Sequence, residues 1–178
     1  GVRESKLDEV PSLALGTSPV TLYEMVSAYA TIADEGRHRA PLMVLRIENR
    51  KGEVLAEFQP NAAERSISAS ALDTLVDAMR GVISRGTGAG IRAWGVKGDL
   101  AGKTGTTQGN TDGWFILMHP QLVGGAWVGF NDARITLRSD YWGQGAHSAL
   151  PIIGDFFARA QGARLIDSEA RFAKAVDD

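Results

Sequence analysis

The architecture of this chain follows from residues 96–131, which read VKGDLAGKTGTTQGNTDGWFILMHPQLVGGAWVGFN. Three runs separated by turn residues fill this stretch, and they cover Val96 to Thr107, Gly113 to His119 and Leu122 to Phe130. Runs of this kind joined by short connections are typical of consecutive antiparallel strands. The middle run is continuously apolar from Trp114 to Met118, which predicts cover on both faces of the sheet. Helices are therefore expected on both sides.

Three amphipathic helices are predicted to supply that cover. Residues 21–24, TLYE, form a capping box, so the first helix should begin there and end at Gly36. Ser70 is expected to cap a second helix that ends at the glycine-rich loop 86–90. A third helix is predicted from Ser148 to Ala160. The expected buried faces are Leu22, Met25, Val26, Tyr29, Ile32 and Ala33; Leu72, Leu75, Val76, Met79 and Ile83; and Leu150, Ile153, Phe156, Phe157 and Ala160.

Two further segments complete the predicted organisation. Leu42 to Glu48 and Glu53 to Phe58 flank a turn that ends in glycine, which predicts a hairpin. Residues 163–178 thin into charge and alanine, so we expect a loosely docked tail. The elements together predict an α/β fold in which an antiparallel sheet is sandwiched by helices. At this length, residues 1–178 should form one domain or a large part of one.

Composition excludes several classes of function. Hydrophobic residues make up 44% and charged residues 22% of the chain, as in a globular protein. The formal charge is -2, without a basic stripe, so nucleic acid is not an expected partner. There is no cysteine, which excludes disulfides, thiolate metal sites and a cysteine nucleophile. No apolar run approaches the roughly 18 residues that span a bilayer, although a parent protein could be anchored upstream.

The histidines and tryptophans suggest no metal or ligand site. His38, His119 and His147 share no ligand spacing, so no metal is expected. Trp114, Trp127 and Trp142 could form a stacking platform for a ligand, but the first two lie in predicted strands and are expected in the core. Asp112 and Asp132 fall at turns, where aspartate is common for structural reasons.

Residues 102–107, GKTGTT, contain the chemistry most suited to a binding site. Lysine supplies a point charge, threonine hydroxyls are donors, and glycine lets a second backbone approach an exposed strand edge. An extended peptide that ends in a carboxylate fits all three features. An ordinary polar edge strand is the alternative, since Lys-Thr-Gly alone should occur by chance in roughly a few per cent of chains this long.

Two phosphate-binding motifs are rejected by their context. A P-loop needs a glycine, four residues and then Gly-Lys-Thr, followed by a helix. From Gly98 to Thr104 the spacing is one residue short, and residues 105–113 have the composition of a turn. The loop 86–90 has alternate glycines but follows a predicted helix and not a strand, which argues against dinucleotide binding.

Several segments in a fixed order connect the chain to a known family. They are SLALGTSPVT at 12–21, AYAT at 28–31, GTG at 86–88, AGKTGTTQ at 101–108, WF at 114–115, WVGF at 127–130 and PIIGDFF at 151–157. From Ser12 to Arg159 the chain resembles the class A, bifunctional penicillin-binding proteins of the 1A type. That family carries three motifs, Ser-x-x-Lys, a serine two residues before asparagine, and Lys-Thr-Gly. Only the third occurs here, so the chain resembles the C-terminal part of a transpeptidase domain.

The resemblance implies roles for four residues. Lys103 would move protons and hold the substrate carboxylate, and Thr104 and Thr106 would bind that carboxylate through their hydroxyls. The N–H of Thr106 would be half of the oxyanion hole, whose other half belongs to the nucleophilic serine. Gly105 would leave room for a peptide stem. Strand alternation sends Lys103 to one face and both threonines to the other, so only a strand at the rim of a cleft could use all three.

The implied activity is that of a serine D,D-transpeptidase that cross-links peptidoglycan stem peptides through an acyl-enzyme and is acylated by β-lactams. Its partners would be stem peptides, β-lactam antibiotics and the upstream part of the same domain, without a cofactor. Its location would be the periplasm, with the parent protein anchored in the bacterial inner membrane. The alternatives are a non-catalytic β-lactam or peptidoglycan sensor or scaffold, and a β-lactamase or carboxypeptidase that resolves the acyl-enzyme with water.

Overall fold

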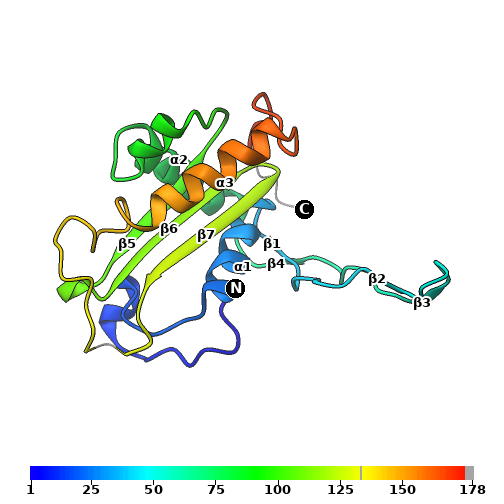
Figure 1. Ribbon diagram of the computed structural model, residues 1–178, viewed down its shortest axis with the longest axis horizontal. Coiled ribbons are helices and arrows are strands. Elements are labelled where there is room, and N and C mark those ends of the chain that lie inside the picture. The colour runs from blue at the N-terminus through cyan, green and yellow to red at the C-terminus, as the bar shows by residue number, and fades with distance from the viewer. Residues whose placement is uncertain (133, 175–178) are drawn as a thin grey trace.

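A three-stranded antiparallel sheet lies at the centre of the computed structural model, which describes residues 1–132 and 134–174 (Figure 1). The strands are β5 (Ala101–Thr106), β6 (Asp112–His119) and β7 (Leu122–Gly129), in the order β5-β6-β7. The predicted succession of three antiparallel strands is therefore confirmed.

The first strand is shorter than the sequence predicts. Gly98 has a φ of +111°, a left-handed conformation that breaks an extended strand, so β5 begins only at Ala101. Val96 and Leu100 belong to the core nonetheless, with 1% and 2% of their surface exposed. Their apolar character reflects burial in an irregular segment and not pairing in the sheet.

Helices α1 (Leu22–Ala33) and α3 (Ala149–Gly162) cover opposite faces of the sheet (Figure 1). A Cβ atom at Gly124 would lie 2.9 Å from Phe157 of α3, and one at Gly125 would lie 2.6 Å from Val26 of α1. Because successive residues of a strand face opposite ways, these two glycines let the helices approach closely from the two sides. The predicted sandwich is confirmed.

Helix α1 begins and ends by the predicted devices. Thr21 Oγ1 accepts the N–H of Glu24 at 3.2 Å, and the Glu24 carboxylate accepts the N–H of Thr21 at 3.4 Å, which completes the capping box. Gly36 has a φ of +78°, and its N–H donates to the carbonyl of Thr31 at 2.8 Å. The last helical residue is Ala33, so the helix ends slightly before the predicted Gly36.

Helix α2 spans Ala69–Ser84 and runs beside β5. Its N-cap is Ser68 and not the predicted Ser70, because the chain enters the helical conformation two residues earlier. Four of the five predicted core positions are buried, whereas Leu75 is 37% exposed because it lies at the border of the buried stripe.

The fully buried residues of α1 are polar, contrary to the sequence prediction. They are Glu24, Ser27 and Thr31, while the predicted apolar positions Leu22, Met25, Val26, Tyr29, Ile32 and Ala33 are half-buried. The carboxylate of Glu24 accepts the N–H groups of residues 3, 4 and 5 at 3.0, 2.7 and 2.9 Å, and also the hydroxyl of Ser5. The hydrogen bonds from Ser5 hold the pKa of Glu24 well below its usual range. Buried Glu24 thus fastens the first residues of the chain to the start of α1.

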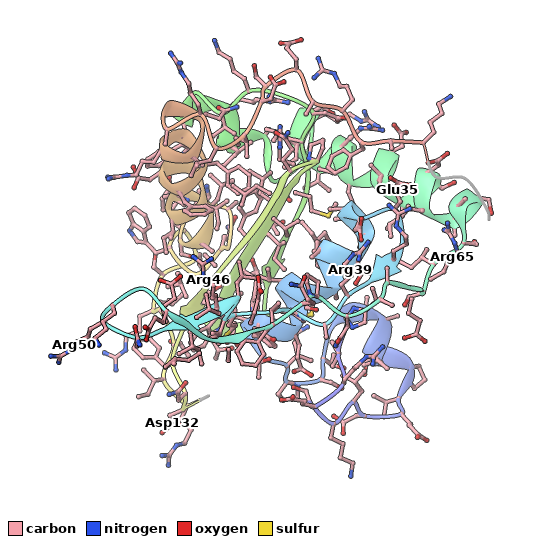
Figure 2. All side chains as sticks on the ribbon, turned by 90° about the vertical axis from the view of Figure 1, so that its right-hand side faces the viewer. Glu35, Arg39, Arg46, Arg50, Arg65 and Asp132 are labelled. Atoms are coloured by element: carbon pink, nitrogen blue, oxygen red, sulfur yellow. The ribbon has the colours of Figure 1, made fainter. Side chains whose placement is uncertain are left out.

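The remaining elements are short. Strand β1 (Arg37–His38) pairs with β4 (Glu64–Arg65), and β2 (Arg46–Glu48) pairs with β3 (Val54–Glu57) in the predicted hairpin. This hairpin extends away from the body of the molecule (Figure 1), and Figure 2 labels Arg46 and Arg50 on it. Its exposed apolar side chains are Met43, Val44, Leu45, Ile47, Val54, Leu55 and Phe58. Three 3₁₀ helices complete the chain, η1 (Pro11–Leu15), η2 (Ala89–Trp94) and η3 (Gln108–Asn110).

Residues 163–174 make closer contacts than a loosely docked tail would. Ile166 is 7% exposed and belongs to the core cluster between the sheet and α3. The N–H of Phe172 donates to the carboxylate of Asp99 at 3.0 Å, and the Arg80 guanidinium lies 5.6 Å from the centre of the Phe172 ring. Residues 175–178 lie outside the described part.

His119 connects this segment to the sheet. It is fully buried at the end of β6, where its Nδ1 accepts the N–H of Gln121 at 3.2 Å. The ring proton is therefore on Nε2, which donates to the carbonyl of Asp167 at 3.1 Å. Burial lowers the pKa of His119 below its ordinary value of 6.5, and the hydrogen bond to Asp167 and the charge of Asp99 oppose this shift.

We expect acid to weaken the fold through His119. Because the unfolded chain takes up this proton at higher pH than the folded chain, the stabilisation is present above pH 6.5 and is lost as the pH falls below it. Urea unfolding followed by tryptophan fluorescence at about pH 7.5 and about pH 5.5 measures the effect. The loss of unfolding free energy between these pH values should be smaller in His119→Gln than in the parent chain, and unchanged in the control His147→Gln. Equal losses in all three proteins would contradict the assignment.

Candidate active site

Strand β5 presents a free edge. Within residues 1–132 and 134–174, no strand pairs with its outer side (Figure 1). The N–H of Thr107 donates to the carbonyl of Asp112 at 3.1 Å. Because alternate residues of an antiparallel ladder turn their N–H and C=O groups toward the neighbouring strand, Lys103 and Gly105 face β6. The N–H and C=O groups of Thr104 and Thr106 therefore point outward, where an extended peptide can pair with them.

The side chains of β5 alternate between the two faces as expected. Thr104 pairs with Phe115, which belongs to the core cluster on the α3 side, so Thr104 and Thr106 lie on that face. Lys103 pairs with Ile116, whose side chain lies on the α1 side beside Gly125.

The long side chain of Lys103 nevertheless reaches the rim. Its Nζ donates to the carbonyl of Thr104 at 2.6 Å, and this carbonyl belongs to the free edge. The ammonium, the outward N–H of Thr106 and the threonine hydroxyls consequently share one edge of the sheet. Alternation alone suggests a separation that the flexible four-carbon stem of lysine removes.

Two loops hold the threonine hydroxyls. Oγ1 of Thr106 accepts the N–H of Gly145 at 3.2 Å, so the hydroxyl proton of Thr106 remains available to a ligand. Oγ1 of Thr104 lies 2.5 Å from Oγ1 of Thr87, in the loop that follows α2. Thr106 is exposed, whereas Thr104 is 9% exposed.

Gly105 has a structural reason in addition to the room it leaves for a peptide. A Cβ atom there would lie 3.0 Å from Cβ of Trp114 on β6. The strand pair is therefore too close at this position for a larger residue without adjustment.

The loop at Gly145 packs tightly over the sheet, and this predicts a cost for adding a methyl group. In Gly145→Ala the new Cβ would lie 2.1 Å from the carbonyl oxygen of Trp114 and 2.5 Å from that of Gly105. Because backbone atoms must move, we expect a loss of about 1–3 kcal/mol in unfolding free energy. Urea unfolding measures this loss. Gly90→Ala is the matched control, since its Cβ would have its nearest neighbour at 3.8 Å, and equal stability of the two variants would contradict the packing argument.

The tryptophans occupy positions that differ from the prediction. Trp114 and Trp127 are half-buried and not core residues, with ring centroids 6.4 Å apart, because they lie at the end of the sheet beyond the helices. The Nε1–H of Trp127 donates to Asp112 at 2.7 Å, so Asp112 has the structural role expected of a turn residue. Trp142 is 58% exposed and makes an edge contact with Tyr141.

The backbone excludes a P-loop, because β5 continues through Thr106 and only the short η3 precedes β6. Within the described residues, no group of three or more His, Asp or Glu side chains is placed to hold a metal ion. No helix in the same residues is long and apolar enough to cross a membrane.

Sequence reasoning identified Lys103, Thr104, Gly105 and Thr106, and the structure brings all four to one strand edge. It did not assign a role at the site to Thr87 or Gly145. Thr87 lies in the GTG segment at 86–88, which was a signal of family membership without a chemical role. Gly145 is 39 residues from its partner Thr106, and no local pattern indicates that contact.

Comparisons with known proteins agree with this arrangement. Residues 4–128 match the family described as the penicillin binding protein transpeptidase domain. Penicillin-binding protein 1A of Neisseria gonorrhoeae is 32% identical over 161 residues, which is 88% of this chain and 20% of the relative. Penicillin-binding protein 1B of Escherichia coli K12 is 40% identical over 137 residues, which is 76% of this chain and 16% of the relative.

Two solved structures have the same fold. Penicillin-binding protein 1A from Haemophilus influenzae superposes with a TM-score of 0.75 at 24% identity, covering 94% of this chain and 30% of that one. The penicillin-binding protein PonA1 from Mycobacterium tuberculosis superposes with a TM-score of 0.69 at 29% identity, covering 93% and 44%. The chain spans about a fifth of the length of the curated relatives it matches. On the family match and these relatives, the chain belongs to the penicillin-binding protein transpeptidase domain family, with relatives of the 1A and 1B types.

Proposed function

We propose that this chain forms one wall of the active site of a peptidoglycan D,D-transpeptidase. The observation that supports it is the free edge of β5, which combines the Lys103 ammonium, two threonine hydroxyls and an unpaired outward N–H at Thr106. The partners would be peptidoglycan stem peptides and β-lactams, and the parent protein would act in the periplasm, anchored in the bacterial inner membrane.

In this proposal the stem peptide binds as an added strand. Its backbone pairs with the outward N–H and C=O groups of β5, and Gly105 keeps the surface low enough for close approach. The terminal carboxylate lies against the hydroxyls of Thr106 and Thr104, with the charge of Lys103 beside it. A β-lactam, whose carboxylate and amide occupy similar positions, takes the same place.

The chemistry is acyl transfer from a serine supplied by the upstream part of the domain. The serine oxygen attacks the carbonyl of the penultimate D-Ala, the carbonyl–nitrogen bond breaks, and D-Ala leaves with a proton on its nitrogen. The N–H of Thr106 donates to the oxyanion that forms on the carbonyl oxygen. An amine of a second stem peptide then attacks the ester, which forms the cross-link and releases the serine with its proton.

The nature of the products tests this function. Full-length protein that contains this segment is incubated with peptidoglycan strands bearing pentapeptide stems, and the products are separated by liquid chromatography and mass spectrometry. We expect cross-linked dimers with release of one D-Ala per link. Trimmed stems without cross-links would indicate a carboxypeptidase, hydrolysed β-lactam a β-lactamase, and a stable β-lactam adduct without any stem product a sensor.

A further inference from the structure

The loop after α2 makes a side-chain contact with the candidate site that the proposed function does not use. Oγ1 of Thr87 lies 2.5 Å from Oγ1 of Thr104, and 17 residues separate them in the sequence. Thr87 is exposed on the surface, whereas Thr104 is 9% exposed. A hydrogen bond therefore links a surface hydroxyl to the inner hydroxyl of the site.

The position of Thr87 is enforced by the glycines on both sides. A Cβ atom at Gly86 would lie 2.8 Å from Cα of Val82, and one at Gly88 would lie 2.9 Å from Ile83 and 3.2 Å from the Phe115 ring. The N–H of Gly88 also donates to the carbonyl of Val82 at 3.0 Å. The loop thus packs directly on α2 and the core, so Thr87 is held beside β5 with little freedom.

Hydroxyl chemistry determines the direction of this bond when an anion is bound. A threonine hydroxyl has one proton and accepts through its lone pairs. If Thr104 donates its proton to a carboxylate, it can only accept from Thr87, so Thr87 must donate. Such a chain of hydrogen bonds polarises each member, with an estimated strengthening of roughly 10–30% per bond.

Thr106 provides an internal parallel on the same face of the strand. Its hydroxyl accepts the N–H of Gly145 at 3.2 Å, which leaves its own proton available to a ligand. Both hydroxyls of the strand therefore have a partner in a neighbouring loop, a backbone N–H for Thr106 and a hydroxyl for Thr104.

We propose that Thr87 is a positioning residue that donates to Thr104 and orients its hydroxyl proton toward the carboxylate of the stem peptide or β-lactam. This inference rests on the proposed function, because it deepens the account of the same site. It predicts that Thr87 affects ligands that carry a free carboxylate and not ligands in which that group is masked.

The test uses four variants of the full-length protein that contains this segment: Thr87→Val, Thr87→Ser, Thr104→Val and the double valine variant. Second-order acylation rates are measured with a penicillin and with its methyl ester, and thermal unfolding is recorded for each protein. We expect Thr87→Val to slow acylation by the penicillin about 10-fold, the upper range of a single neutral hydrogen bond. Thr87→Ser should retain the parent rate, and the double variant should react no more slowly than Thr104→Val alone. Acylation by the ester should be the same in Thr87→Val and the parent.

Three outcomes overturn the inference. If Thr104→Val slows the penicillin and Thr87→Val does not, Thr87 has no role at the site, while the proposed function stands. If Thr87→Val slows penicillin and ester equally and lowers the unfolding temperature, its role is only in packing. If the parent protein reacts with neither compound, the proposed function fails together with the inference.

Discussion

The 178-residue chain will gain no mass when it is incubated alone with penicillin, even at saturating concentration and for long times. It contains no serine followed three residues later by lysine, so no serine has a lysine one helical turn away to accept its proton. Lys103 and Thr106 provide charge and an oxyanion donor, but neither supplies the nucleophile in this proposal. Intact-mass spectrometry measures the result, and weak reversible binding at β5 would leave the mass unchanged.

The matched control is the same chain extended by the upstream part of the domain, in which labelling should appear. An adduct of one penicillin mass on a specific serine of the 178-residue chain would show that the nucleophile has been misplaced. Tandem mass spectrometry of the labelled peptide would then identify the correct residue.

Replacement of Lys103 with alanine in the full-length protein should slow acylation by a fluorescent penicillin by about 100-fold or more. The reason is the location of its Nζ, which lies 2.6 Å from the outward carbonyl of Thr104 and is the cation of the free edge. Because Lys103 is exposed, the loss should appear in the acylation rate and not in the unfolding temperature.

Lys97→Ala is the control for this variant, since Lys97 is an exposed lysine outside the strand. Stopped-flow fluorescence gives the rate for each protein. Acylation of Lys103→Ala at the parent rate would remove Lys103 from the mechanism.

The periodic elements of the fold could be predicted from local sequence. Strands β6 and β7 begin and end within one residue of the predicted runs, because apolar continuity and turn residues mark both ends. The start of β5 could not be predicted in the same way. Val96 and Leu100 are as apolar as strand residues, and only the backbone conformation of Gly98 separates them from the sheet.

The buried face of α1 was beyond local reasoning. Glu24 is an acceptor for N–H groups about 20 residues earlier in the chain, so its burial depends on partners that helical periodicity does not contain. The candidate site divides in the same way. Its four strand residues follow from one motif, whereas Thr87 and Gly145 reach it through contacts between distant segments.

The free edge of β5 also bears on the solubility of this protein. A row of unpaired N–H and C=O groups that can accept a ligand peptide can equally accept the strand of another molecule, which is how edge-to-edge aggregation begins. Gly102 and Gly105 lower the strand propensity of this edge, and Lys103 places a charge on it, both of which discourage such pairing. Recognition and protection against self-association therefore depend on the same residues, so substitutions that make this strand a stronger β-former would favour fibre-like assembly at the expense of turnover.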